Sequence, residues 1–399
     1  MAVLTMPEAK ADGTQESAAL LPIYKRAAPV FVSGKGCRLT ADDGREYLDL
    51  GAGIAVNALG YGDAAIATAV HGAIDTGLVH TSNLYRTLPG ERLAEALVAN
   101  CFADRAFYCN SGAEANEAAL KFARRWARGE GGEAKHEFVA LQGSFHGRLF
   151  GSVALTDRPA YRTPFTPVMP GAHIVAKSIE AVAAVVSAER TAALIVEPVQ
   201  GEGGVVPLDA GFLAEIRALA TERNVLLIFD EVQCGLGRTG KLFAHEWANV
   251  VPDMMTLAKP LAGGLPMGAT LMTERVAATI QPGDHATTFG GGPLVASVAL
   301  AVFTRVSDPA LLDNVHGRGE QIREAVSTWP SASVGAVRGM GLMWGIETHE
   351  PAAPIVARTL EAGVLVLTAG EKVIRLLPPL VISEEDLAEG LDVLRGALQ

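Results

Sequence analysis

Two residues of this 399-residue chain have the side chains and surroundings needed for chemistry on an aldehyde. Asp230 ends the apolar run VLLIF, and Lys259 is a lone cation between the apolar segments MMTLA and PLAGG. An amine in a mostly apolar pocket is kept partly neutral, so it can form a Schiff base with an aldehyde. A carboxylate that faces the ring nitrogen of pyridoxal 5'-phosphate (PLP) keeps that nitrogen protonated. The pair therefore predicts a PLP site, with the cofactor attached covalently to Lys259.

A phosphate-binding segment is predicted at NSGAE, residues 110–114. Ser111, Gly112 and Ala113 would present a hydroxyl and backbone N–H groups at the start of a helix, where an anion is stabilised. The alternative is an ordinary helix N-cap with Glu114 in the first turn. The residues alone leave both interpretations open.

The segment FHGR follows the next predicted strand. Phe145 could stack on a flat cofactor ring, and Arg148 could hold a carboxylate through its planar guanidinium group. The alternatives are a core phenylalanine and a surface arginine. His146 is interpreted as structural, because no spacing in this region makes it a metal ligand.

Four further residues could contact a phosphate or a carboxylate. Glu202 lies in the Gly-rich loop EPVQGEGG, where it could pair with an arginine or stay solvated. Arg375 lies inside the apolar strand KVIRLLPPLVI, and a charge in such a strand has a specific partner. Thr287 and Thr288 precede a pair of glycines, so their hydroxyls could reach a ligand or could serve only the turn.

The segment GLGRTG, residues 235–240, offers an alternative of another class, an NAD-dependent dehydrogenase. It matches the dinucleotide-binding pattern G-x-G-x-x-G, with an acidic residue at Asp253 further on. However, DEVQC separates the glycines from the preceding strand, and too few residues follow for the expected helix and second strand. We therefore interpret these glycines as a close-approach turn beside the active site.

Short strand patterns alternate with helical ones through most of the chain, which predicts an α/β fold with a mostly parallel sheet flanked by helices. Ligands of such open sheets bind at the carboxyl ends of the strands, where the candidate residues cluster. We expect residues 1–60 to contribute to a small α+β domain, residues 61–295 to form a large PLP-binding domain, and residues 296–399 to complete the small domain.

Composition argues against other classes of protein. The net charge of −11 and the lack of a basic stripe make nucleic acid an improbable partner. No apolar run reaches the roughly 18 residues of a membrane span. The four cysteines lack CxxC spacing, which predicts reduced thiols and no metal site. Residues 1–18 form a polar arm without the features of a secretory signal, so a cytoplasmic protein is expected.

The chain contains the motifs NSGAEANEAALKFAR, FHGR, EPVQGEGG, LLIFDEVQCGLGRTGKLFAHE, AKPLAGGLPMGA and TTFGGGP. Together they resemble those of the class III (ornithine-type) aminotransferases, which are PLP enzymes of fold type I. The segments HTSNLY and GIAVNALG resemble the acetylornithine aminotransferase branch in particular. The resemblance runs from about Leu21 to the C-terminus.

The resemblance implies a role for each matching residue. Lys259 resembles the Schiff-base lysine and proton shuttle, and Asp230 the partner of the pyridine nitrogen. The other implied cofactor contacts are Gln233 at the ring hydroxyl, Phe145 on the ring, and Ser111, Gly112, Ala113 and Thr288 at the phosphate. Thr288 would come from the other subunit of a homodimer, with Thr287 as its substrate-side neighbour. The implied substrate contacts are Arg148 at the α-carboxylate and Glu202 and Arg375 as a gating pair.

The activity implied is transfer of the δ-amino group of N-acetyl-L-ornithine to 2-oxoglutarate, a step of arginine biosynthesis. Succinylornithine, N-acetyllysine or a carrier-bound lysine, ornithine and 4-aminobutyrate remain alternative donors. Two segments depart from the family pattern: residues 60–64 read GYGDA in place of a GHGHP-type stretch, and Pro260 follows the lysine. Because a residue before proline is pushed toward extended backbone, we expect Lys259 to end a strand.

Overall fold

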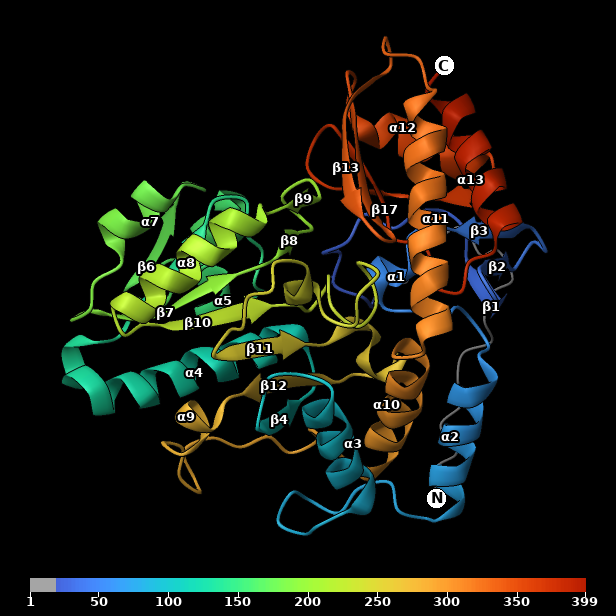
Figure 1. Cartoon of the computed structure of the whole chain (residues 1–399). Helices are drawn as coiled ribbons and strands as arrows, with labels where there is room; N and C mark the ends of the chain where they lie inside the picture. The colour runs from blue at the N-terminus through green and yellow to red at the C-terminus, as the bar shows by residue number, and fades with distance from the viewer. Residues whose placement is uncertain (1–18) are drawn as a thin grey trace.

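The computed structural model describes residues 19–399, so the polar arm expected at residues 1–18 lies outside the described residues. A seven-stranded sheet forms the centre of the large lobe, at the left of Figure 1. In order across the sheet, its strands are β4 (Arg105–Cys109), β12 (Gly268–Met272), β11 (Met254–Leu257), β10 (Leu226–Asp230), β7 (Thr191–Val196), β5 (Glu137–Leu141) and β6 (Ala172–Val175). Only β12 runs antiparallel to its neighbours, so the expected mostly parallel sheet is confirmed.

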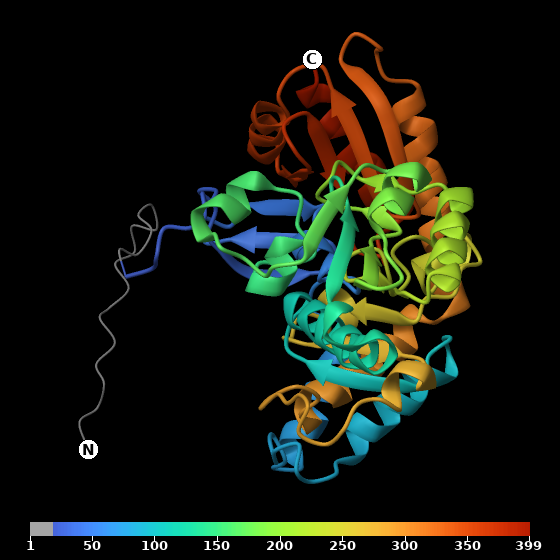
Figure 2. The same ribbon diagram turned by 90° about the vertical axis from the view of Figure 1, so that its left-hand side faces the viewer.

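The central strands are apolar throughout because helices cover both faces of the sheet. Along β10, Leu226 and Ile228 pack toward α4 (Gly112–Gly131), while Leu227 and Phe229 pack toward α7 (Ile179–Val185) and α8 (Ala210–Glu222). Successive side chains of a strand point to opposite faces, which explains this division. Figure 2 shows the central sheet between these layers.

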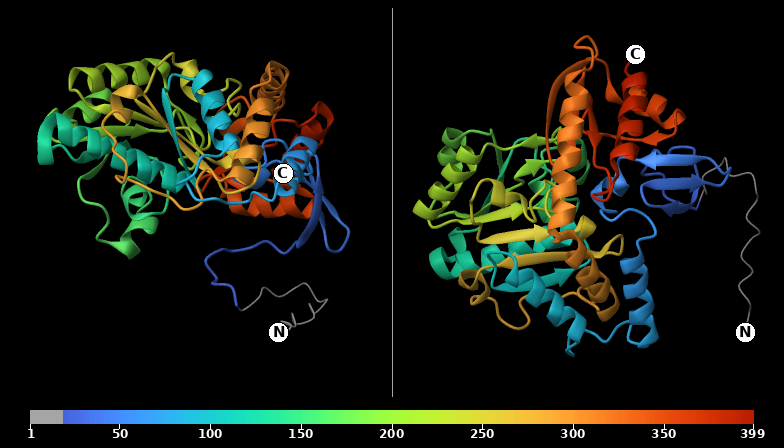
Figure 3. Two further views of the ribbon diagram at one scale, coloured as in Figure 1. Left: turned by 90° about the horizontal axis from the view of Figure 1, so that it is seen from below. Right: turned by 45° about the vertical axis from the view of Figure 1, so that its right-hand side comes forward.

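A second lobe is built from both ends of the described chain. The strands β1 (Phe31–Lys35), β2 (Arg38–Ala41) and β3 (Glu46–Asp49) pair with β15 (Val364–Leu365) in one sheet. A further sheet contains β13 (Val334–Met340), β14 (Met343–Thr348), β17 (Val373–Leu376) and β16 (Leu367–Thr368). The helices of this lobe are α11 (Pro309–Ser327), α12 (Ala352–Glu361) and α13 (Glu384–Ala397). Figure 3 shows the N-terminal strands beside the C-terminal helix.

The remaining elements connect or cover these sheets. They are α1 (Ala52–Ala55), α2 (Ala64–Asp75), α3 (Leu88–Ala99), α5 (Phe150–Ala154), α6 (Pro159–Arg162), α9 (Glu274–Ala277), α10 (Pro293–Val306), β8 (Val199–Gln200), β9 (Val206–Pro207) and the short 3₁₀ helices η1 (Gly132–Ala134), η2 (Thr163–Phe165), η3 (Ala244–Trp247) and η4 (Lys259–Ala262). Within residues 19–399, no single helix is long and apolar enough to cross a membrane. The pair α10 and α11 would qualify by length and composition, but it is bent by 62°.

The backbone at Lys259 differs from the extended conformation predicted from Pro260. β11 ends at Leu257, and Lys259 begins the 3₁₀ helix η4 with a φ of 27°. Proline at the second position of a short helix is compatible with its fixed φ. A residue before proline avoids the right-handed helical conformation, and Lys259 does so with a positive φ instead of an extended backbone. The prediction that Lys259 ends a strand was therefore wrong.

The glycines of GLGRTG are a close-approach turn, as expected, but they approach the second lobe. A Cβ on Gly240 would lie 2.7 Å from the ring of His316 in α11, and Gly237 is tight against Leu312. Within the turn, the buried Arg238 donates to the carbonyls of Leu342 and Pro378 at 2.9 and 2.5 Å. The turn therefore joins the lobes, and no long helix follows it as a dinucleotide-binding motif requires.

Candidate active site

A cavity of about 400 Å³ lies at the carboxyl ends of five strands. Each strand contributes one cluster to its lining: residues 110–113 after β4, 145–148 after β5, 197 and 202 after β7, 230, 232 and 233 at the end of β10, and 258–259 after β11. The convergence expected at this edge of the sheet is therefore present. The lining also includes Val56, which directly follows α1.

Lys259 lines this cavity, and its side chain is partly buried. Burial first, and then the nearby Arg375 guanidinium, lower the pKa of the Lys259 ammonium from 10.5 to about 8. Glu202, Asp230 and Glu197 act in the opposite direction. With this pKa, about a tenth of the molecules carry a neutral amine at pH 7, and this fraction can act as a nucleophile and as a proton acceptor.

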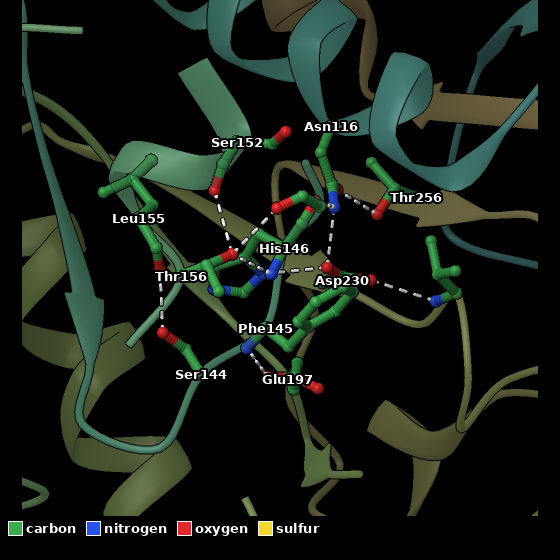
Figure 4. A network of polar contacts seen from close by, with 12 residues as sticks. Asn116, Ser144, Phe145, His146, Ser152, Leu155, Thr156, Glu197, Asp230 and Thr256 are labelled. Atoms are coloured by element: carbon green, nitrogen blue, oxygen red, sulfur yellow. Dashed lines mark hydrogen bonds and ion pairs between the residues drawn. The ribbon is translucent and has the colours of Figure 1, made fainter. Parts of the chain in front are cut away.

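The Asp230 carboxylate is held by a network of buried polar groups (Figure 4). Its Oδ2 accepts a hydrogen bond from Asn116 at 2.7 Å and lies 2.8 Å from Nδ1 of His146. Thr256 in turn donates to Oδ1 of Asn116 at 2.7 Å, which fixes the amide. Among residues 19–399, Oδ1 of Asp230 accepts only the backbone N–H of Val232, at 3.1 Å. The network orients Asp230, which ends β10 and lines the cavity.

The sequence did not reveal Asn116, the His146 contact or Glu197 as parts of the site. Asn116 is a polar residue within the buried stripe of α4, and this was the signal that could have found it. His146 is structural, as interpreted, but it acts on Asp230, and its Nε2 is buried without a hydrogen-bond partner among residues 19–399. Burial raises the pKa of Glu197 to about 7, while it accepts the N–H of Phe145 at 2.8 Å.

The N-terminus of α4 borders the cavity. Ser111 is the N-cap, and its Oγ accepts the N–H of Glu114 at 3.2 Å, so the N-cap interpretation holds. Gly112 and Ala113 line the cavity in the first turn of a 20-residue helix. A Cβ on Gly112 would lie 2.6 Å from the side chain of Val232, so a residue larger than glycine would not fit at this position without a shift. Anion binding at this helix end is compatible with the N-cap.

Phe145 and Arg148 both line the cavity. The Arg148 guanidinium is exposed and stacks over the ring of Tyr161, with 3.2 Å between its central carbon and the ring centroid. The Phe145 ring meets Tyr161 edge to face, with centroids 6.4 Å apart. The planar guanidinium is thus held at the cavity with polar edges free for a carboxylate, although its role in binding one stays a prediction.

Arg375 and Glu202 form an ion pair at the cavity, with 2.6 Å between Nη1 and Oε1. The Arg375 side chain is 3% exposed and that of Glu202 is 28% exposed, so the glutamate is the partner with access to solvent. Arg375 also donates to Oε1 of Gln233 at 3.2 Å. Gln233 lines the cavity, but this bond engages its oxygen with Arg375. The gating role and the ring-hydroxyl contact stay predictions.

Thr287 and Thr288 do not line this cavity. They border a separate hollow of about 710 Å³, together with Asn83, Tyr108 and His285. The nearest link is from Asn110, whose amide donates to Oγ1 of Thr287 at 3.3 Å. This placement is compatible with a contact to the site of another subunit, and it does not support one within the same chain.

The residues around the cavity fit PLP. The cavity offers a buried amine of lowered pKa, a buried carboxylate with an oxygen toward the same space, and an open helix N-terminus left bare by Gly112. These groups match an aldehyde, a pyridine nitrogen and a phosphate respectively. Within residues 19–399, no group of His, Cys, Asp or Glu side chains could hold a metal ion.

An α/β sheet with this lysine and carboxylate at its carboxyl edge defines the PLP-dependent enzymes of fold type I. The family model of the class-III aminotransferases matches residues 23–398, and the chain belongs to this family. The mitochondrial acetylornithine aminotransferase of Alnus glutinosa is 49% identical over 95% of this chain and 85% of its own. That of Gloeobacter violaceus is 44% identical over 94% of each chain.

Solved structures agree with this family in fold. The ornithine aminotransferase of Toxoplasma gondii superposes with a TM-score of 0.91 at 29% identity, covering 95% of this chain and 92% of that one. The N-acetylornithine aminotransferase of Stenotrophomonas maltophilia gives a TM-score of 0.82 at 37% identity, covering 94% and 96%. The chain is an aminotransferase, and the alternative of an NAD-dependent dehydrogenase is not supported.

Proposed function

We propose that this chain transfers the δ-amino group of N-acetyl-L-ornithine to 2-oxoglutarate, giving N-acetyl-L-glutamate 5-semialdehyde and L-glutamate, with PLP attached to Lys259. The reaction would serve arginine biosynthesis. One observation carries the proposal: a buried amine with a pKa of about 8 shares its cavity with Asp230 and with the Glu202 carboxylate. Relatives named acetylornithine aminotransferase, at 42–49% identity over nearly the whole chain, support the choice of donor.

Each residue has a separate task in this scheme. When bound, PLP supplies an aldehyde and an electron-withdrawing ring. Lys259 would hold this aldehyde through Nζ, and its neutral amine would take and return a proton at the same atom. The Asp230 carboxylate would face the pyridine nitrogen, and Asn116 and His146 hold it in that orientation.

Two carboxylate sites serve the two substrates in turn. Arg148 binds the α-carboxylate of the donor from the edge of the cavity. While the donor reacts, Glu202 covers Arg375. It then turns outward so that Arg375 can bind the α-carboxylate of glutamate or 2-oxoglutarate. The exposure of Glu202 and the burial of Arg375 support this direction of movement. Because both substrates use one cavity, we expect ping-pong kinetics.

The absorbance spectrum and one variant test the proposal. The purified protein is expected to absorb in the visible, and Lys259→Ala should lose both this absorbance and transamination. Lys372→Ala, which removes an exposed lysine, is the matched control and should keep both. A colourless protein that binds NAD, or sequential kinetics with no half-reaction on the donor alone, would contradict the proposal.

A panel of amino donors with 2-oxoglutarate as acceptor tests the choice of substrate. N-acetylornithine is expected to give the highest kcat/KM. The competing donors are N-succinylornithine, N-acetyllysine, carrier-bound lysine, ornithine and 4-aminobutyrate. A higher value for any of these would reassign the donor and keep the reaction class.

We also propose a homodimer located in the cytoplasm, in which Thr288 of each protomer reaches the phosphate of the other site and Thr287 lies beside the substrate. Large apolar side chains exposed near these threonines support the dimer, since such patches mark protein interfaces. They are Leu78, Val79, Leu84, Tyr85, Leu88 and Phe289. Sedimentation of the purified protein tests the dimer, and cell fractionation tests the location.

A further inference from the structure

The segment after β3 contains a left-handed turn of a kind that L-residues rarely form. The four residues with positive φ, between 47° and 65°, are Ala52, Gly53, Ile54 and Ala55. Left-handed backbone brings the Cβ of an L-residue close to the following carbonyl, so it occurs as single residues and not as runs. Three of these four residues carry a Cβ. Such backbone persists only where its surroundings over-determine it.

Asp49 supplies the contacts that hold this turn. Its Oδ1 accepts the backbone N–H groups of Gly51 at 2.7 Å and Ala52 at 2.9 Å. Its Oδ2 accepts the hydroxyl of Tyr61 at 2.6 Å. Asp49 is 3% exposed, and hydrogen bonds to a buried carboxylate are short and strong. Loss of the Tyr61 hydroxyl would leave a buried carboxylate oxygen without this donor.

Tyr61 is itself fixed in place by its backbone. It exchanges two hydrogen bonds with Gly36, at 2.9 and 2.8 Å, outside the regular strands. A Cβ on Gly34 would lie 2.8 Å from the Cβ of Tyr61, so the strand packs directly on this side chain. Burial raises the pKa of the Tyr61 hydroxyl, which therefore remains a donor near neutral pH. Tyr61 is also the residue where this chain reads GYGDA in place of a GHGHP-type stretch.

The turn borders the cavity of the active site. The N–H of Val56 donates to the carbonyl of Ala52 at 2.8 Å, and Val56 lines the cavity that contains Lys259. The turn, α1, also packs against η4, the helix that begins at Lys259. Figure 1 shows α1 between the two lobes. A shift of the turn would therefore move part of the cavity wall.

We propose that Asp49 and Tyr61 are positioning residues for substrate binding, which hold the left-handed turn at residues 52–55 and thereby set the place of Val56 in the cavity wall. The inference rests on the proposed function, because it assigns this wall to the substrate. Neither residue lines the cavity, so both act through the turn and not on the reacting atoms.

Tyr61→Phe in the PLP-loaded enzyme tests the inference, because it removes one hydroxyl and keeps the ring. Tyr47→Phe is the matched control, since it removes a hydroxyl from β3 away from the turn. In Tyr61→Phe, amide hydrogen exchange in residues 51–56 is expected to become about tenfold faster, while exchange in strands β1 to β3 stays unchanged. In Tyr47→Phe, exchange in residues 51–56 should not change. The KM of the best donor from the panel should rise about fivefold with kcat nearly unchanged, as for lost binding without lost chemistry.

A second variant separates positioning from a general loss of stability. Ala52→Gly removes one Cβ from the strained backbone, so in combination with Tyr61→Phe it should restore much of the protection and lower KM again. Faster exchange throughout β1 to β3, or an unchanged KM beside faster exchange of the turn, would overturn the inference. Inactivity of wild-type enzyme toward every donor would contradict the proposed function instead, and exchange in the turn would still decide whether Tyr61 holds it.

Discussion

At the residue scale, burial of Lys259 determines when its amine can react. With a pKa of about 8, the amine is neutral in about a tenth of molecules at pH 7 and in half at pH 8. The neutral fraction increases with pH. The rate at which apoenzyme regains visible absorbance with PLP should therefore rise with pH and reach half its maximum near pH 8. The control is a free lysine derivative, and a midpoint near its ordinary pKa of 10.5 would contradict the burial effect.

The Glu202 side chain gives a second prediction at this scale. Glu202→Gln keeps the size of the side chain and removes the charge that faces Arg375. Arg375 then competes with Arg148 for the carboxylate of the donor, so the donor half-reaction should slow about tenfold, equivalent to about 1.4 kcal/mol. The half-reaction with 2-oxoglutarate should change little. Single-turnover measurements of each half-reaction test this, and equal slowing of both would exclude a gate.

The residues that could be predicted from sequence are charged residues that lie within or at the end of apolar segments. Lys259 and Arg375 are cations within apolar segments, and Asp230 ends a strand of five buried residues. Asn116 and His146 were not predicted as its partners, because contacts between residues 30 or more positions apart depend on the packing of α4 against the sheet. A strand or helix pattern states which face a residue occupies, and not which side chain it meets there.

At the scale of elements, the turn at residues 235–240 gives a prediction with a matched control. Gly240→Ala places a Cβ 2.7 Å from His316 at a φ of 94°, whereas Gly283→Ala has a φ of 96° and open space. Positive φ alone should lower the free energy of unfolding by about 1–2 kcal/mol. The overlap should add about 1–3 kcal/mol at Gly240. Chemical denaturation measures both, and equal losses would show that the lobes do not pack tightly here.

Strands of the large lobe such as β7 and β10 were predicted because helices bury both of their faces, which leaves continuous apolar runs. β6 was not predicted. β12 was not predicted, because Gly268–Met272 follows a Gly- and Pro-rich stretch and has no polar cluster after it.

The conformation of Lys259 was predicted wrongly for a related reason. A local steric rule excludes conformations, but tertiary packing selects among those that remain.

At the scale of the whole molecule, one described chain leaves the proposed site incomplete. Thr287 and Thr288 border a hollow outside the cavity of Lys259, among exposed apolar side chains such as Leu84 and Phe289. In a C2 dimer the same surface serves both protomers, so each would supply this segment to the other. The proposal can therefore be tested by separating the two contributions onto different chains.

Coexpression of Lys259→Ala with Thr288→Val makes this separation. Alone, the first variant should be inactive, and the second should lose most activity because a buried phosphate loses a hydrogen bond worth about 1.5–3 kcal/mol. In the mixed dimer, the site that retains Lys259 receives Thr288 from the other chain and is intact. Random pairing makes half of the dimers mixed, each with one intact site, so about a quarter of wild-type activity should return. Activity no higher than the average of the two variants would mean that Thr288 does not act across an interface.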